Sequence, residues 1–231
     1  MPKEISRSKI DLFIECKRCC YLYVNHRIGK PGGYPLTLNL AVDELLKKEF
    51  DHYRALGQPH PLMTANGIDA VPAVHSLMDR WRHNFTGVSF SDTVRDFRVF
   101  GAIDDLWVDP NGNHFVVDYK ATARREPVTA LSEDWHITYK RQMEVYQWLL
   151  RKNGLTVSNT AYFVYCTGDK TKSAFNARID FDIHVIPYEG DDSWVEVTLD
   201  EMKICLDQPN VPDSSEECKF CKYRAKVNAL I

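Results

Sequence analysis

The chain has 231 residues, of which 44% are hydrophobic and 26% are charged, and its net charge is −3. These values are typical of an ordinary soluble globular protein. They give no overall attraction to nucleic acid, although a local basic channel can lie on an acidic body. Runs of about 18 apolar residues are absent, and residues 1–10 contain no apolar signal core. We therefore expect an intracellular, cytoplasmic protein with no membrane partner.

The predicted elements alternate between helices and strands. In chain order they are helices over residues 8–23, 38–53 and 71–81, strands over 97–108 and 114–120, a helix from 132 or 134 to 153, strands over 159–166 and 175–187, and a short helix over 199–207. This order predicts a mixed α/β core with helical additions at both ends. We divide the chain into an N-terminal helix with a cysteine pair (1–36), a core (37–198) and a C-terminal helix with a second cysteine pair (199–231).

The two strands in the middle of the chain are predicted to form a hairpin. Residues 97–108 and 114–120 alternate and are rich in aromatic and β-branched types. Between them, Pro110 suits the first central position of a type I turn, and Gly112 suits the left-handed residue that closes the loop. The turn therefore predicts that Asp109 faces Asn113.

This register places Asp104 directly opposite Asp118, with Lys120 on the same face as Asp118. Two facing carboxylates repel each other, and a divalent cation between them removes the conflict. Their hard oxygen ligands suit Mg²⁺ or Mn²⁺. Such a cation polarises a phosphoryl oxygen and activates a bound water, and Lys120 is placed to contact that water or the phosphate. Taken alone, however, an Asp-x-Lys pair is most often a solvated strand edge.

Two helices supply further candidates. Asp43 lies within the apolar helical segment 40–46 and is our candidate third metal ligand, although it could also be a surface residue. Gln142 and Tyr146 lie on one stripe of the helix that ends at Asn153. A glutamine on a core-facing stripe needs hydrogen-bond partners, which the edge of the sheet or a bound phosphate could supply. Tyr146 by itself is most often a core aromatic.

These motifs resemble a known family. Gly101-Ala102-Ile103-Asp104, Val117-Asp118-Tyr119-Lys120 and the later Gln-x-x-x-Tyr are similar, in order, to the RecB-like branch of the PD-(D/E)XK nuclease superfamily, which includes CRISPR-associated RecB-type exonucleases. The resemblance covers about residues 8–225. It implies a restriction-endonuclease-like mixed β-sheet core flanked by helices. It also implies a metal-dependent DNA nuclease.

The resemblance also implies roles for single residues. Asp104 and Asp118 would bind the metal ion, Lys120 would be the catalytic lysine, and Gln142 and Tyr146 would orient the site. The family's early helix usually offers a histidine ligand, and the matching position here is Asp43. Loss of the imidazole leaves the metal preference open and favours magnesium over manganese.

The cysteines form two C-x2-C pairs about 200 residues apart. Cys16 and Cys19 form the first pair, and Cys218 and Cys221 form the second. Together they complete a tetrahedral ligand set, which fits zinc. The resembling family often carries a four-iron cluster whose last cysteine would fall at Val227, so that pattern is broken here and an iron–sulfur cluster and zinc both stay open. The metal would be structural and join the chain ends in a small cysteine-rich element. The alternative is a set of buried apolar thiols.

Basic and aromatic residues near these motifs could contact a DNA strand. Arginine and lysine could follow the phosphates and aromatic rings could stack on bases, although such residues are often ordinary surface or core residues. The candidates are Lys17, Arg18, Arg27, Lys30, Arg124, Arg125, Lys140 and Arg141, with the rings of Tyr21, Tyr23, Tyr34 and Trp135.

Our first functional hypothesis is a divalent-metal-dependent nuclease that cuts DNA at single-stranded ends or flaps, in repair, recombination or CRISPR adaptation. The alternative is a catalytically altered protein of the same fold that binds nucleic acid or acts as a scaffold subunit. A small-molecule hydrolase is a third reading, without a supporting pocket signature. Helicase motifs are absent from the sequence, so a helicase or another nuclease-complex subunit is an expected partner.

Overall fold

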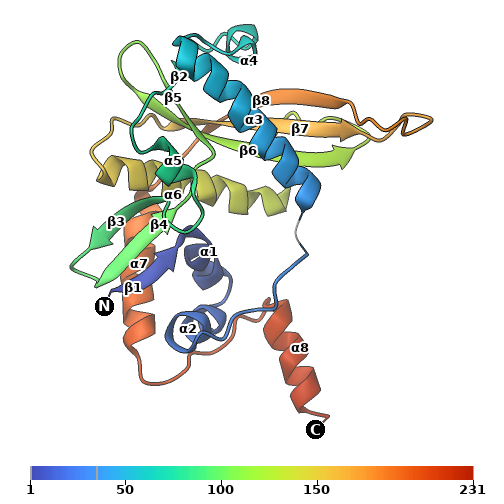
Figure 1. The fold of residues 1–231 in the computed structure, drawn as a ribbon. Helices are drawn as coiled ribbons and strands as arrows, with labels where there is room; N and C mark the ends of the chain where they lie inside the picture. Colours follow the sequence, from blue (N-terminus) through green and yellow to red (C-terminus); the bar gives the residue numbers. More distant parts are fainter. Residues whose placement is uncertain (1, 35, 231) are drawn as a thin grey trace. The chain divides into compact units, whose positions relative to one another are not determined.

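The computed structural model describes residues 2–34 and 36–230, which form two compact units (Figure 1). The first unit holds the described residues of Met1–Tyr34, Ser89–Phe100 and Asp192–Ile231, and the second holds those of Pro35–Val88 and Gly101–Asp191. The predicted division into three segments stays a prediction, because compactness does not show which parts of a chain fold independently.

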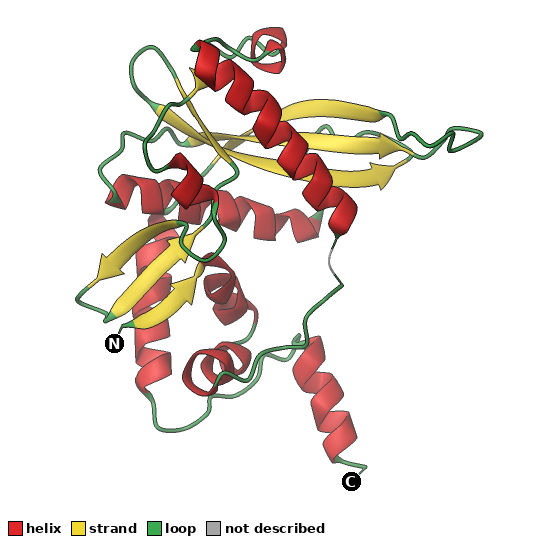
Figure 2. Ribbon diagram, viewed as in Figure 1, coloured by secondary structure: helices red, strands yellow, loops and turns green. Residues whose placement is uncertain are grey.

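A five-stranded mixed sheet forms the centre of the second unit (Figure 2). Its strand order is β2-β5-β6-β7-β8, with β6 and β7 parallel and the other neighbours antiparallel. A parallel pair needs a crossover, which helix α6 provides between β6 and β7. The strands are β2 (Val71–Pro72), β5 (Asp105–Val108), β6 (His114–Arg124), β7 (Thr160–Asp169) and β8 (Phe181–Glu189); the helices are α3 (Thr37–Leu56), α4 (Pro61–Ala65), α5 (Met78–Arg82), η1 (Asp134–His136) and α6 (Ile137–Lys152).

The two long helices contact opposite faces of strand β6. Side chains alternate between the faces of a strand, so Val117 and Tyr119 point to one side and Asp118 to the other. Helix α3 packs Phe50 against the first face in a buried apolar cluster. Helix α6 reaches the second face, where Gln142 bonds to Asp118. Polar residues on β6 therefore meet a helix that carries polar partners.

The first unit contains a three-stranded sheet of order β1-β4-β3, in which β1 and β4 are parallel. Arg95, in the turn between β3 and β4, forms ion pairs with Asp92, Glu196 and Asp200. These contacts tie the hairpin to helix α7, and the hydrogen bond with Asp200 is the largest cause of the raised pKa of Arg95. The elements are β1 (Lys3–Ser6), α1 (Arg7–Glu15), α2 (Lys17–His26), β3 (Val88–Asp92), β4 (Phe97–Gly101), α7 (Ser193–Asp207) and α8 (Lys219–Asn228).

Two predicted helices are wrong in part. The helix predicted over residues 8–23 breaks at Cys16, whose backbone is extended with φ −161° and ψ 107°. The helix predicted over residues 71–81 exists only from Met78 to Arg82. Before it, Val71 and Pro72 pair with β5 at the edge of the sheet, where a proline without an amide hydrogen is tolerated.

The continuous strand predicted over residues 97–108 is also wrong. Its first part, β4, and its second part, β5, belong to different sheets. Between them, the Ile103 amide donates to the Trp81 carbonyl (3.2 Å), so the backbone bonds to α5 rather than to a strand. Gly87 permits this path: its φ is +54°, and a Cβ there would lie 2.4 Å from the Gly101 carbonyl oxygen.

The predicted fold class is confirmed. Both sheets are mixed, helices flank them, and a four-cysteine group joins the N-terminal and C-terminal parts of the chain. Within residues 2–34 and 36–230, every helix is too short or too polar to cross a membrane.

Candidate active site and cysteine site

The β5–β6 hairpin has the register that the turn predicts. Asp105 pairs with Val117, and the Asp109 amide donates to the Asn113 carbonyl (3.0 Å). The same register would set the preceding residue, Asp104, against Asp118. The hydrogen-bonded ladder ends before that pair is reached.

Asp104 lies immediately before β5 rather than inside the ladder. Its Oδ2 accepts a hydrogen bond from the Tyr119 amide (2.9 Å), so the carboxylate is held beside the segment that carries Asp118 and Lys120. Its backbone carbonyl accepts a hydrogen bond from Arg82 Nε (2.9 Å). The side chain and the backbone of Asp104 are therefore both held in place. The expected cross-strand pair with Asp118 does not form, because the predicted strand is interrupted between β4 and β5.

Asp118 and Lys120 lie together on the face of β6 that meets α6. The Asp118 side chain is fully buried, the Lys120 side chain is 15% exposed, and the two form an ion pair. Burial lowers the pKa of Lys120, but the nearby Asp118 and Asp104 carboxylates outweigh it and raise that pKa. Lys120 is therefore a protonated ammonium at neutral pH.

Gln142 links both of these residues to helix α6. Its Nε2 donates to Asp118 Oδ1 (2.8 Å) and to Tyr146 Oη (3.0 Å), and its Oε1 accepts from Lys120 Nζ (3.2 Å). The edge of the sheet thus supplies the hydrogen-bond partners that a glutamine on this stripe needs. An amide that bonds a carboxylate and an ammonium at once sets the orientation of both groups.

Asp43, on α3, is connected to Asp104 by Lys47, a residue that was not identified from the sequence as part of the site. Lys47 Nζ lies 2.7 Å from Asp43 Oδ2 and 3.3 Å from Asp104 Oδ1. Burial is the main cause of the raised pKa of Asp43, and Asp104 adds to it. For Lys47, burial lowers the pKa, but Asp104 and Asp43 outweigh it and raise the pKa.

A small pocket opens at this point between α3, β6 and α6. The residues that line it are Asn39, Val42, Asp43, Tyr119, Lys120, Ala121 and Tyr139. Two of the predicted site residues, Asp43 and Lys120, therefore line the same pocket. Asp104 is joined to the pocket by Lys47 and by the Tyr119 amide.

Carboxylate oxygens are preferred ligands of hard cations, so Asp43, Asp104 and Asp118 suit such an ion by their chemistry. The Lys47 ammonium lies between Asp43 and Asp104. In the described part of the chain, the four cysteines are the only group of three or more possible ligands that lie within 4.8 Å of one another. Asp43, Asp104 and Asp118 are thus not drawn to a single point. One positive charge nevertheless already bridges Asp43 and Asp104, as a bound cation would.

A buried ionic network around Asp105, the residue after Asp104, was not predicted from the sequence. Asp105 is fully buried, and its carboxylate pairs with Arg54 and with Arg82 (2.9 Å). It also accepts a hydrogen bond from Tyr119 Oη (2.8 Å). Burial raises the pKa of the Tyr119 phenol, and Asp105 adds to the rise, so the phenol stays protonated and donates. The sequence signal that could have indicated this network is the Asp104-Asp105 dipeptide at the start of β5. Neighbouring side chains of a strand point to opposite faces, so one aspartate faces the site and the other faces the interior.

The two cysteine pairs occupy equivalent positions at two helix starts. Cys16 is the residue before α2 and Cys218 is the residue before α8; in each case the second cysteine lies three residues on, in the first helical turn. The amide four residues after each first cysteine donates to that cysteine's carbonyl (3.1 and 3.0 Å). A helix N-terminus stabilises the thiolate form of a nearby cysteine. Burial nevertheless raises the pKa of the Cys19 and Cys221 thiols, so a cation bound by the four cysteines would have to displace their protons.

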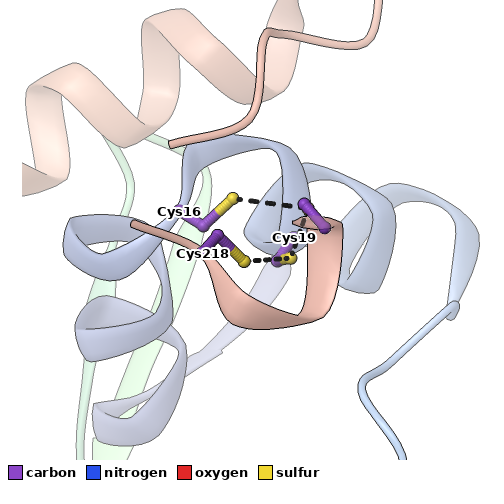
Figure 3. A group of neighbouring side chains, drawn as sticks. Cys16, Cys19 and Cys218 are labelled. Atoms are coloured by element: carbon purple, nitrogen blue, oxygen red, sulfur yellow. Dashed lines mark hydrogen bonds between the residues drawn. The ribbon is translucent and has the colours of Figure 1, made fainter. Parts of the chain in front are cut away.

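The four sulfur atoms lie within 4.8 Å of one another, and Figure 3 shows three of these cysteines, Cys16, Cys19 and Cys218. Cys16 lies 3.9 Å from Cys221, and Cys19 lies 3.7 Å from Cys218 and 3.5 Å from Cys221, all measured between Sγ atoms. Thiolates about 2.3 Å from one tetrahedral ion are separated by roughly 3.8 Å, so the group fits a single ion. Cys20 stands outside the group, and burial raises the pKa of its thiol to about 12.

A comparison with protein families shows the superfamily of the chain. The family described as the PD-(D/E)XK nuclease superfamily matches residues 4–226. The chain belongs to this superfamily. A search of curated proteins finds no match. Among solved structures, the chain in the crystal structure of SSO0001 is 17% identical, with 99% of this chain and 87% of that chain covered and a TM-score of 0.45.

We predict that Asp105→Ala lowers the free energy of unfolding by about 3–5 kcal/mol, because it removes the buried anion that Arg54 and Arg82 share and leaves them only the half-exposed Asp51. Urea denaturation followed by circular dichroism measures this loss. The control is Asp182→Ala on β8, an exposed carboxylate whose removal should change stability by at most about 0.5 kcal/mol. Equal effects of the two substitutions would contradict a stabilising role for the network.

Proposed function

We propose that the protein is a divalent-metal-dependent DNA nuclease. Membership of the superfamily supports a nuclease in general. The observation that carries the finer proposal is the contact between Lys120, Asp118 and Gln142, beside a pocket that Asp43 also lines. This arrangement places the Lys120 ammonium and the Asp43 carboxylate in one pocket, with the Asp118 carboxylate and the Gln142 amide in contact with Lys120.

The chain's own groups divide the work of phosphodiester hydrolysis. Asp104 and Asp118, with Asp43, would hold Mg²⁺ or Mn²⁺, which when bound supplies Lewis-acid activation of the phosphate and of a water. Lys120 places a positive charge where the phosphate develops negative charge. Gln142 and Tyr146 keep Asp118 and Lys120 from rotating away, so the site is preorganised.

The substrate we propose is a DNA strand that is single-stranded or has a free end or flap, with exonuclease or flap cleavage in repair, recombination or CRISPR adaptation. The motif order favours the RecB-like branch, and a helicase or another nuclease-complex subunit is the proposed partner. Candidate phosphate contacts lie in both units: Lys17, Arg18, Arg27 and Lys30 in the first, and Arg124, Arg125, Lys140 and Arg141 in the second.

A second candidate is a nuclease-fold subunit that binds DNA without cutting it. Lys47 favours it, because its ammonium already neutralises Asp43 and Asp104 and would compete with a divalent ion. Asp43 also stands where the family usually has histidine. The activity measurement below separates the two candidates.

For the cysteine site we propose a single zinc ion with a structural role. The sulfur separations of 3.5–3.9 Å match thiolates that share one tetrahedral ion. In a four-iron cluster each thiolate binds a different iron, and in a two-iron cluster the thiolates are divided between two irons, so in neither do all four sulfurs lie this close together. Binding would couple the two helix starts and contribute folding free energy.

We expect the purified protein to degrade labelled single-stranded DNA with Mg²⁺ or Mn²⁺ and not with EDTA. Lys120→Ala and Asp118→Ala should each lower kcat by at least about 100-fold, since the first removes the positive charge at the reacting phosphate and the second removes a proposed ligand of the metal ion. Lys48→Ala is the matched control, because Lys48 is an exposed lysine of α3 that pairs with Glu44. Undiminished activity in both site variants rejects the assignment, and DNA binding without cleavage by the wild-type chain supports the second candidate.

We further expect anaerobically purified protein to be colourless and to contain about one zinc per chain. Cys221→Ser should lose the metal and lower the melting temperature of the protein, whereas Cys205→Ser, outside the group, should retain it. Metal analysis and an absorption spectrum measure these outcomes. A brown protein with absorption near about 400 nm and several irons per chain would establish an iron–sulfur cluster instead.

A further inference from the structure

One tryptophan of the chain is displayed to solvent next to the candidate active site. Trp135, in η1, is 48% exposed. Trp81, Trp107 and Trp148 are buried in the interior, and Trp194 is half-buried. A large, flat and exposed aromatic side chain at the edge of a functional pocket is a surface on which another flat group can stack.

A short chain of ring contacts joins Trp135 to the candidate catalytic lysine. The ring centroids of Trp135 and Tyr139 are 5.3 Å apart in an edge-to-face arrangement. Lys120 Nζ lies 4.3 Å from the centroid of the Tyr139 ring. The two steps together cover less than 10 Å, and Tyr139 itself lines the pocket with Asp43 and Lys120.

The local structure holds Trp135 in place. The fully buried His136 ring lies 3.9 Å from the Trp135 ring, measured between centroids. His136 Nδ1 accepts a hydrogen bond from the Glu133 amide (3.0 Å), and Thr138 Oγ1 donates to the Trp135 carbonyl (3.0 Å). A ring that is already ordered loses little conformational entropy when a ligand stacks on it.

A positive charge accompanies this ring. Arg124, at the end of β6, lies 3.6 Å from Glu133 in the residues that lead into η1. Its side chain is 45% exposed, so it can also contact a phosphate. The strand that carries Asp118 and Lys120 thus continues to a guanidinium that pairs with Glu133, two residues before Trp135.

We infer that Trp135 is a stacking platform for an unpaired base of single-stranded DNA, one nucleotide away from the phosphate that contacts Lys120. The inference rests on the proposed nuclease function and specifies its substrate as a strand with a free base. An unpaired base offers its π-face to the indole without regard to sequence, whereas a paired base inside a duplex is already stacked on both sides.

The test uses the full-length protein without added Mg²⁺ or Mn²⁺, so that binding is measured without cleavage and the metal proposed for the cysteine site is retained. The probes are a fluorescein-labelled oligothymidylate, for affinity by anisotropy, and its unlabelled form, for quenching of tryptophan fluorescence. We expect the oligonucleotide to quench the wild-type emission and Trp135→Ala to weaken binding by roughly 5- to 150-fold. Trp135→Phe should retain most of the affinity and lose most of the quenching.

Two controls define the outcome. Phe85→Ala removes an exposed aromatic side chain outside the ring chain and should leave affinity unchanged. A blunt duplex should bind the wild-type protein and Trp135→Ala equally well. Equal loss of affinity in Phe85→Ala and Trp135→Ala, unchanged affinity in Trp135→Ala, or no binding of the oligonucleotide would each overturn the inference. Trp135-dependent binding without cleavage in Mg²⁺ or Mn²⁺ would support the platform and reject the proposed nuclease function, so the two failures are distinguishable.

Discussion

The pairing of β5 with β6 is the constraint on which the candidate site depends. Side chains along a strand alternate between the two faces of a sheet, so a slip of one residue in this hairpin would exchange the faces of its partners. In the observed register Asp118 and Lys120 meet the polar stripe of α6, while Val117 and Tyr119 pack into the apolar cluster under α3. A register shifted by one residue would place polar side chains in the apolar cluster, which is unfavourable. The register that the apolar face stabilises therefore also fixes the positions of Asp118 and Lys120 on the opposite face.

Opposite charges in pairs connect the site to both flanking helices. Lys120 pairs with Asp118 and bonds Gln142 of α6, and Lys47 of α3 connects Asp43 to Asp104. Behind them, the buried Asp105 and its two arginines support the segment that bears Asp104. A divalent ion entering this site would take over the neutralising role that the Lys47 ammonium has here, so the flexible lysine side chain would have to move while the carboxylates stay close to their positions.

Much of this arrangement could be predicted from the sequence because it follows from short-range rules. The turn from Asp109 to Asn113 determines the hairpin register, and the helical spacing places Gln142 and Tyr146 on one face. The convergence of the cysteine pairs follows from the four thiols that one tetrahedral ion needs. The break between β4 and β5 depends on contacts with Trp81 and Gly87, which are distant in sequence and have no local signal. Lys47 and Arg82 were missed for the same reason, since a lysine on a helix is usually solvated and only the fold shows its partners.

An anomalous difference map from crystals grown with Mn²⁺ tests the central claim most directly. The account predicts one peak bound by Asp104 and Asp118, with the Lys47 ammonium displaced from its position between Asp43 and Asp104. Well-ordered carboxylates without a peak, and Lys47 still bridging the same two groups, would contradict it.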